Sequence, residues 1–142
     1  MVPKAIPISE AKAKFSELAR RAGMGEEVIS VNKHSKNAPV SLIKTDILTS
    51  ALAAMKYTLT ETKDNELNIL TIAVEELPVY GEGSSREEAI EALTDAVLDY
   101  LSVYKQRIEL FSHVDTPETQ GYVLKLRRCG TDRQAIRETL GL

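Results

Sequence analysis

The residue types that most often carry catalysis are sparse in this sequence and are not arranged for it. His34 and His113 are the two histidines, and neither stands at a metal-ligand spacing. Cys129 is the only cysteine, and it precedes Gly130 at the expected C-terminal end of a helix, where the helix dipole does not favour a thiolate. We therefore predict no catalytic residue, no metal site and no bound cofactor.

Two further patterns resemble catalytic motifs only superficially. The run Gly81-Glu82-Gly83-Ser84-Ser85 precedes an expected helix, as a phosphate-binding loop would. It lacks both the Walker lysine and the third glycine of the dinucleotide-binding motif, so we interpret it as a plain strand-to-helix turn. Adjacent acids such as Glu87-Glu88 diverge on a helix and are typical of a solvated surface. An enzyme is thus the least favoured class of function.

The distribution of charge is the stronger signal. Residues 1–44 carry eight Lys/Arg and four Glu, whereas residues 45–118 carry five Lys/Arg and fifteen Asp/Glu. A basic head beside an acidic middle indicates two partners of opposite charge, although ordinary solvated charge would look the same. The candidate DNA-binding residues come from one expected helix and one expected hairpin: Lys12, Lys14, Arg20, Lys33, His34 and Lys36.

Hydrophobic spacing in the first 55 residues predicts the order β-α-β-β-α. Such a small unit buries little apolar surface alone, so we expect it to form a homodimer. The two-fold axis of a dimer would duplicate the basic side chains in the geometry that a palindromic duplex requires. The expected elements are a short edge strand at 6–8, a helix capped by Ser9 and ending near Gly23, strands at 28–31 and 40–43, and a helix capped by Thr45.

A second unit follows, with strands expected at 57–60 and 67–74. Ser85 and Glu88 form a capping box for a helix that extends to about Ile108.

Two shorter helices are expected in the tail. Thr116-Pro117 begins the first, and Thr131 with Gln134 caps the second. Their apolar faces have two interpretations, as anchors for a protein partner or as packing against the long helix of the second unit. The candidate anchors are Tyr122, Leu126, Ile136 and Leu140.

The head resembles the opening of Phd/YefM antitoxins. Residues 6–18 read Ile-Pro-Ile-Ser-Glu-Ala-Lys-Ala-Lys-Phe-Ser-Glu-Leu, like the family's strand followed by Ser-Glu-Ala-Arg and an Asn/Phe-Ser-Glu-Leu helix, and 28–34 and 39–43 are similar to its next two strands. The chain departs from the family at Lys12, often Arg, and near Lys36, where a Gly is usual. The resemblance implies a homodimer that binds operator DNA, represses its own operon and neutralises a cognate toxin.

The second unit is similar to the HicB antitoxin domain over about residues 57–104. Glu76-Leu77-Pro78 and the helix entry at 83–89 carry the similarity, whereas Val79-Tyr80 stands where Gly-Cys is usual. This resemblance implies a small, non-catalytic, degenerate RNase H-like βββαβ module. The toxin would then be a RelE-like or HicA-like endoribonuclease.

Together these observations predict an α+β chain with three segments. Residues 1–55 would be a Phd/YefM-like DNA-binding and dimerisation domain, 56–110 a HicB-like domain and 111–142 a helical tail. No apolar run approaches the roughly 20 residues that span a membrane, so a cytoplasmic protein is expected. The alternative function is a stand-alone transcriptional regulator whose second domain senses a ligand.

Overall fold

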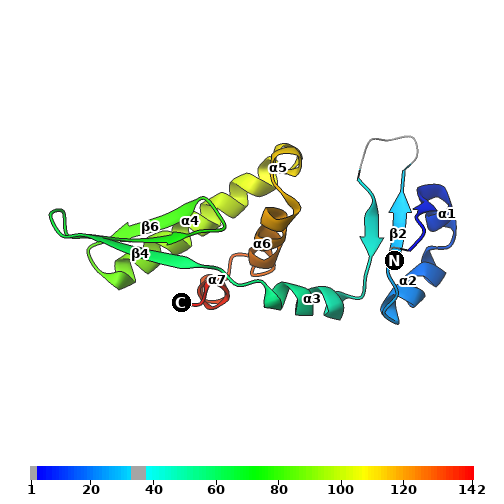
Figure 1. The fold of residues 1–142 in the computed structure, drawn as a ribbon, viewed down its shortest axis with the longest axis horizontal. Helices are drawn as coiled ribbons and strands as arrows, with labels where there is room; N and C mark the ends of the chain where they lie inside the picture. The colour runs from blue at the N-terminus through cyan, green and yellow to red at the C-terminus, as the bar shows by residue number, and fades with distance from the viewer. Residues whose placement is uncertain (1–2, 33–37) are drawn as a thin grey trace. The chain divides into compact units, whose positions relative to one another are not determined.

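A computed structural model describes residues 3–32 and 38–142 of the chain. The fold is α+β and divides into two compact units, Met1–Ala54 and Met55–Leu142, each with its own three-stranded sheet (Figure 1). We call them the head and the second unit. None of the described helices is long and apolar enough to cross a membrane.

The head sheet has the strand order β1-β2-β3. β1 pairs in parallel with β2, and β3 pairs with β2 in the antiparallel direction. Pro7 lies in β1, at the sheet edge where a residue without a backbone N–H is tolerated. The elements are β1 (Ile6–Pro7), α1 (Ile8–Ala13), α2 (Phe15–Gly23), β2 (Val28–Val31), β3 (Val40–Leu42) and α3 (Thr45–Ala54).

The helix expected after Ser9 is present but divided, and its start differs from the prediction. α1 begins at Ile8 directly after Pro7, and no side chain caps it, so the prediction of Ser9 as N-cap was wrong. The chain bends at Lys14, yet helical hydrogen bonds continue across the bend, from the Lys14 N–H to Glu10 O (3.1 Å) and from the Leu18 N–H to Lys14 O (3.0 Å). Lys12 therefore lies on a different helix from Arg20.

The second unit opens with an antiparallel sheet of order β4-β5-β6 and continues with four helices. Residues 81–85 were interpreted as a plain strand-to-helix turn, which was wrong for residues 81–83, because they belong to the strand β6. No fourth strand follows α4 within residues 107–142, where the βββαβ expectation required one. The elements are β4 (Leu59–Asp64), β5 (Ile69–Val74), β6 (Val79–Gly83), α4 (Arg86–Gln106), α5 (Ile108–Val114), α6 (Pro117–Arg127) and α7 (Arg133–Leu140).

Side chains cap three of these helices. Ser85 Oγ accepts the Glu88 N–H (3.2 Å), as expected, while the Glu88 carboxylate accepts from Ser84 Oγ (2.6 Å) and Ser84 N (2.8 Å). The Ser84 hydrogen bonds lower the pKa of Glu88. Thr116 caps α6 by accepting the Thr119 N–H, but Asp132 rather than the predicted Thr131 caps α7.

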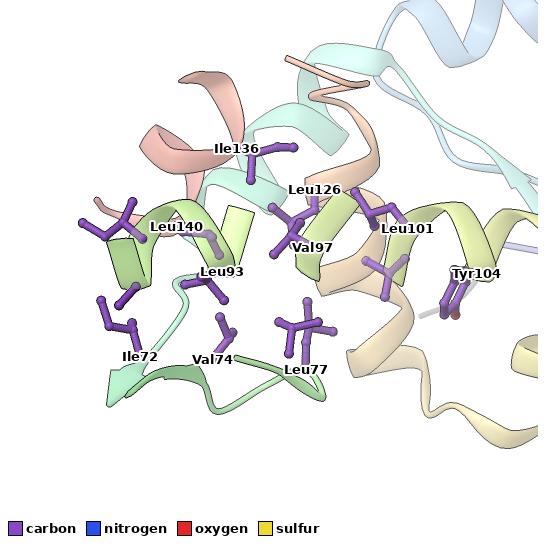
Figure 2. Packing of buried hydrophobic residues seen from close by; sticks show 14 residues of the cluster. Ile72, Val74, Leu77, Leu93, Val97, Leu101, Tyr104, Leu126, Ile136 and Leu140 are labelled. Atoms are coloured by element: carbon purple, nitrogen blue, oxygen red, sulfur yellow. The ribbon is translucent and has the colours of Figure 1, made fainter. Parts of the chain in front are cut away.

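Helix α4 is the centre of the second unit's core. It packs against β5 and β6 and also against α6 and α7. Figure 2 shows Ile72, Val74 and Leu77 on one side of α4, and Leu126 and Ile136 on the other. A helix enclosed on two sides must be apolar on more than one stripe. The buried α4 residues are accordingly spread widely: Ala89, Ile90, Leu93, Thr94, Val97, Leu101 and Tyr104.

Aromatic contacts attach α5 to α4. The Phe111 ring stacks on Tyr104, with centroids 4.3 Å apart and an interplanar angle of 11°. Burial raises the pKa of Tyr104 to about 12, because the charged phenolate is disfavoured away from water.

Two glycines allow α4 to lie directly on β6. A Cβ at Gly81 would collide with the backbone nitrogen of Leu93 and the carbonyl oxygen of Ala89. A Cβ at Gly83 would lie 2.6 Å from the backbone nitrogen of Ala89. Because these neighbours are backbone atoms, they cannot move aside as a flexible side chain could. The backbones of α4 and β6 therefore lie closer together at these two positions than they could if either glycine carried a side chain.

The Gly81→Ala substitution should therefore destabilise the second unit, because α4 must move away from β6 to accommodate the methyl group. We expect a loss of about 3 kcal/mol or more in the free energy of unfolding, measured by urea denaturation. Gly23→Ala is the matched control, since a Cβ there meets no atom within 4 Å. Equal urea midpoints for the two variants would contradict the close-approach argument.

Candidate partner-binding surfaces

Three of the predicted DNA-binding residues lie on the exposed surface of the head. Lys12 is on α1, Lys14 is at the bend and Arg20 is on α2. Lys14 Nζ is 3.4 Å from a carboxylate oxygen of Glu10, an exposed pair that holds the lysine only weakly. These side chains keep the reach that phosphate contacts require, although nothing in the structure tests that role. The other three predicted residues, Lys33, His34 and Lys36, lie outside the described residues.

An open apolar hollow lies beside Lys12 in the head. It has a volume of about 530 Å³. Phe15 is 56 % exposed and Val40 64 % exposed at this hollow, large values for such side chains. The head's own core is small and consists of Ala11, Leu18, Ala22 and Val28. The hollow is lined by Ile8, Ala11, Lys12, Phe15, Ser30, Asn32, Ala38, Val40 and Leu42.

The tail residues predicted as toxin anchors lie mostly inside the second unit. Leu126 and Ile136 are fully buried and Leu140 nearly so, all in the cluster that surrounds α4. Tyr122 is partly buried. Its carbonyl accepts a hydrogen bond from the Tyr57 hydroxyl (2.5 Å), and the two rings are 5.2 Å apart. The structure thus shows the alternative arrangement, packing on the long helix. Toxin binding by these residues stays untested, and for the buried three it would require release from the core.

Ion pairs also connect the last helix of the tail, α7, to α4. Arg133 pairs with Asp95 (2.8 Å) and Glu91, and Arg137 pairs with Glu91 and with Glu87 (3.4 Å). The carboxylates are more than half exposed, so each pair contributes little to stability, but together they orient α7 along the helix. The basic tail therefore neutralises part of the acidic middle, and the acidity of α4 is not all available to a partner.

One face of the second unit's sheet is exposed, and it was not predicted from the sequence. Thr60, Thr62, Tyr80 and Glu82 are exposed, and Thr71 is partly so. Alternation along Thr58-Leu59-Thr60-Glu61-Thr62 was a usable signal for β4, but β6 was not recognised as a strand. Within the described residues, no group of His, Cys, Asp or Glu side chains is arranged to hold a metal ion.

Comparison with protein families gives one match, over residues 1–140 and thus over both units. That family is PHD-like, described as the antitoxin of RelE/RelB toxin–antitoxin systems. The match does not show a HicB domain, and no curated protein sequence matches the chain.

A solved structure is similar to the whole fold. It is the crystal structure of the antitoxin part of a proposed toxin/antitoxin system from Syntrophomonas wolfei subsp. wolfei. The similarity has a TM-score of 0.67, covers 96 % of each chain and occurs at 16 % sequence identity. At this identity the similarity establishes a common fold.

A pair of leucines on α6 can separate a structural role of the tail from a binding role. Leu126 is fully buried, whereas Leu124 is 39 % exposed on the same helix. We expect Leu126→Ala to lower the free energy of unfolding by about 2–5 kcal/mol, because it leaves a cavity beside α4. Leu124→Ala should cost about 1 kcal/mol or less. Urea denaturation measures both, and similar losses would contradict the placement of Leu126 in the core.

Proposed function

The chain belongs to the PHD-like family, the antitoxins of type II, RelE/RelB-type toxin–antitoxin systems, and from that premise we propose how its two units divide the work. The head binds operator DNA as a homodimer and represses the operon. The second unit binds and neutralises the cognate toxin. The observation that carries the proposal is the match to one antitoxin family across both units, combined with a basic head and an acidic second unit.

DNA binding by the head is supported by its exposed cations. Lys12, Lys14 and Arg20 lie on α1, at the bend and on α2, and the basic 33–36 segment follows β2 in the chain. Each phosphate neutralised by such a cation releases counterions, so affinity should fall steeply with salt. The acidic second unit is unsuited to the same partner, which leaves the head as the DNA-binding part.

Replacing Lys12 and Arg20 with Ala in the full chain should weaken binding to the operon's own promoter duplex. The log–log dependence of affinity on salt should become shallower, by about 0.9 for each phosphate that the variant no longer neutralises. Lys63→Ala with Lys105→Ala removes the same charge from exposed positions of the second unit and should leave the slope unchanged. Fluorescence anisotropy across a salt series measures both variants. A slope that is equal in all three proteins would show that the head does not hold the DNA.

Dimerisation of the head is supported by the apolar hollow around Phe15. A monomer would leave Phe15, Ile8 and Val40 largely in water, and burial of each side chain at a two-fold interface would contribute roughly 1.5–3 kcal/mol at full burial. A second copy of the head offers the same apolar surface, and a two-fold interface needs only one such self-complementary patch.

Phe15→Glu should convert the full-length protein from dimer to monomer, since it would place a carboxylate in the apolar interface. Met24→Glu is the control, because Met24 is 64 % exposed and does not line the hollow. Sedimentation velocity at micromolar concentration measures the state of each protein. A monomeric wild type, or a Phe15→Glu variant that stays dimeric, would rule out this interface.

The toxin that suits the second unit is a small basic endoribonuclease of the RelE kind. Opposite charge steers such a pair together and selects against wrong partners. A HicA-like toxin is the alternative that rests on the HicB-like residues 57–104. Co-purification with the protein encoded by the neighbouring gene, and rescue of growth when that protein is expressed, test the antitoxin function. Failure of both would overturn it.

A further inference from the structure

The sheet of the second unit is covered on one face. α4 is the helix that packs on β5 and β6. The pleat places Gly81 and Ile72 toward α4, since Gly81 abuts the helix backbone and Ile72 is fully buried. Tyr80 and Thr71 therefore point away from the helix, because neighbouring residues of a strand alternate between faces.

The uncovered face is built of hydroxyl groups around a tyrosine. Strand register places Thr60, Ala73 and Tyr80 in one row across the sheet. The next row contains Thr62, Thr71 and Glu82. The Thr71 hydroxyl lies 3.5 Å from the Glu82 carboxylate, which confirms that both are on the same side. We call these six residues the open sheet face.

Tyr80 is the one large side chain on this face, and it is 60 % exposed. Exposed tyrosine supplies apolar area and a hydrogen-bonding hydroxyl at low cost in conformational entropy, which is why tyrosine is enriched at binding hot spots. The flanking threonines can donate and accept hydrogen bonds without the entropy loss of longer side chains. The face therefore has the composition of a protein-binding surface.

The surrounding charge selects the kind of partner. Residues 57–85, which form the sheet and its turns, contain six acidic residues and a single basic one, Lys63. Glu82 lies on the open sheet face itself, whereas Glu61 lies on the side of α4, where it pairs with Arg86. Nucleic acid would be repelled, and a second copy of the same face would meet like charge. A protein with a basic surface is the partner that this charge attracts.

We propose that the open sheet face is the surface through which this antitoxin binds its toxin, with Tyr80 as the central anchor against a flat, basic surface of the toxin. The inference rests on the proposed function and specifies where the second unit acts. It also removes a conflict, since the toxin can bind while Leu126, Ile136 and Leu140 remain in the core.

A second exposed patch, on α5, is the competing location. Leu110 and Val114 are exposed there, one helical turn apart. The exposed charges next to the patch in the chain are of both signs, Arg107 and Glu109, so it offers no clear complementarity to a basic partner.

The test uses the full-length antitoxin and the protein encoded by the neighbouring gene as the probe. Thr60→Lys with Thr62→Lys adds two cations to the open sheet face and should weaken the complex about tenfold or more in a titration, with loss of growth rescue. Tyr80→Ala should weaken it as well. Ser102→Lys with Thr131→Lys adds the same charge at exposed positions off the face and should bind as the wild type does. Circular dichroism and urea midpoints confirm that each variant is folded.

Each outcome of this test leads to one conclusion about the toxin-binding surface. If the wild type neither binds nor rescues, the proposed antitoxin pairing fails. If the wild type binds and the folded face variants bind equally well, the open sheet face is not the site and this inference alone fails. Loss of binding in Leu110→Lys with Val114→Lys, with the face variants unaffected, would place the toxin on α5 and overturn the inference. An equal loss of binding in the control with Ser102→Lys and Thr131→Lys would show that net charge alone causes the effect, and it would also overturn the inference.

Discussion

The close approach of α4 to β6 is the constraint on which the second unit depends. At Gly81 and Gly83 no side chain separates strand from helix, so the helix lies low on the sheet. Leu93 and Val97, both fully buried, belong to one core cluster with the sheet residues Ile72, Val74 and Val79. A helix held this deeply on one side still has apolar residues on the other, and α6 and α7 cover them.

That arrangement determines which surfaces remain for partners. The tail helices complete the core, and Arg133 and Arg137 occupy carboxylates of α4. Much of the acidic charge on the long helix is therefore already compensated within the unit. The acidic charge around the sheet has fewer counterparts, the pair between Arg86 and Glu61 (2.9 Å) being one. The tail stabilises the unit, and the sheet is left as the side with uncompensated acidic charge.

The sequence predicted local features well where local physics decides them. The cap of α4 at Ser85 and that of α6 at Thr116 follow from hydrogen bonds within one turn, and both were expected. At α7, Thr131 and Asp132 are both competent caps, and their order along the chain could not decide between them. At α1, Pro7 fixes the entry of the helix, so Ser9 falls inside it.

Long-range packing accounts for what the sequence did not reveal. Glycine is disfavoured in strands, so Tyr80-Gly81-Glu82-Gly83 looked like a turn; the reason for those glycines lies on α4, about ten residues further along. The tail helices posed the same difficulty, because an apolar stripe shows that a face is covered without showing by what. The long helix was one of two candidate covers in the sequence, and the fold selects it, as α4, for Leu126 and Ile136.

The two units differ in how much of their apolar surface they bury internally, and this difference bears on function. The second unit encloses a large continuous core of its own around α4. The core cluster of the head contains four buried apolar residues, and Phe15 and Val40 are more than half exposed. A unit that small gains stability chiefly by association. Dimerisation, which we propose for the head, would link its stability to protein concentration by mass action. If the head represses the operon as such a dimer, as we propose, the DNA-binding form would be lost first as the protein concentration falls.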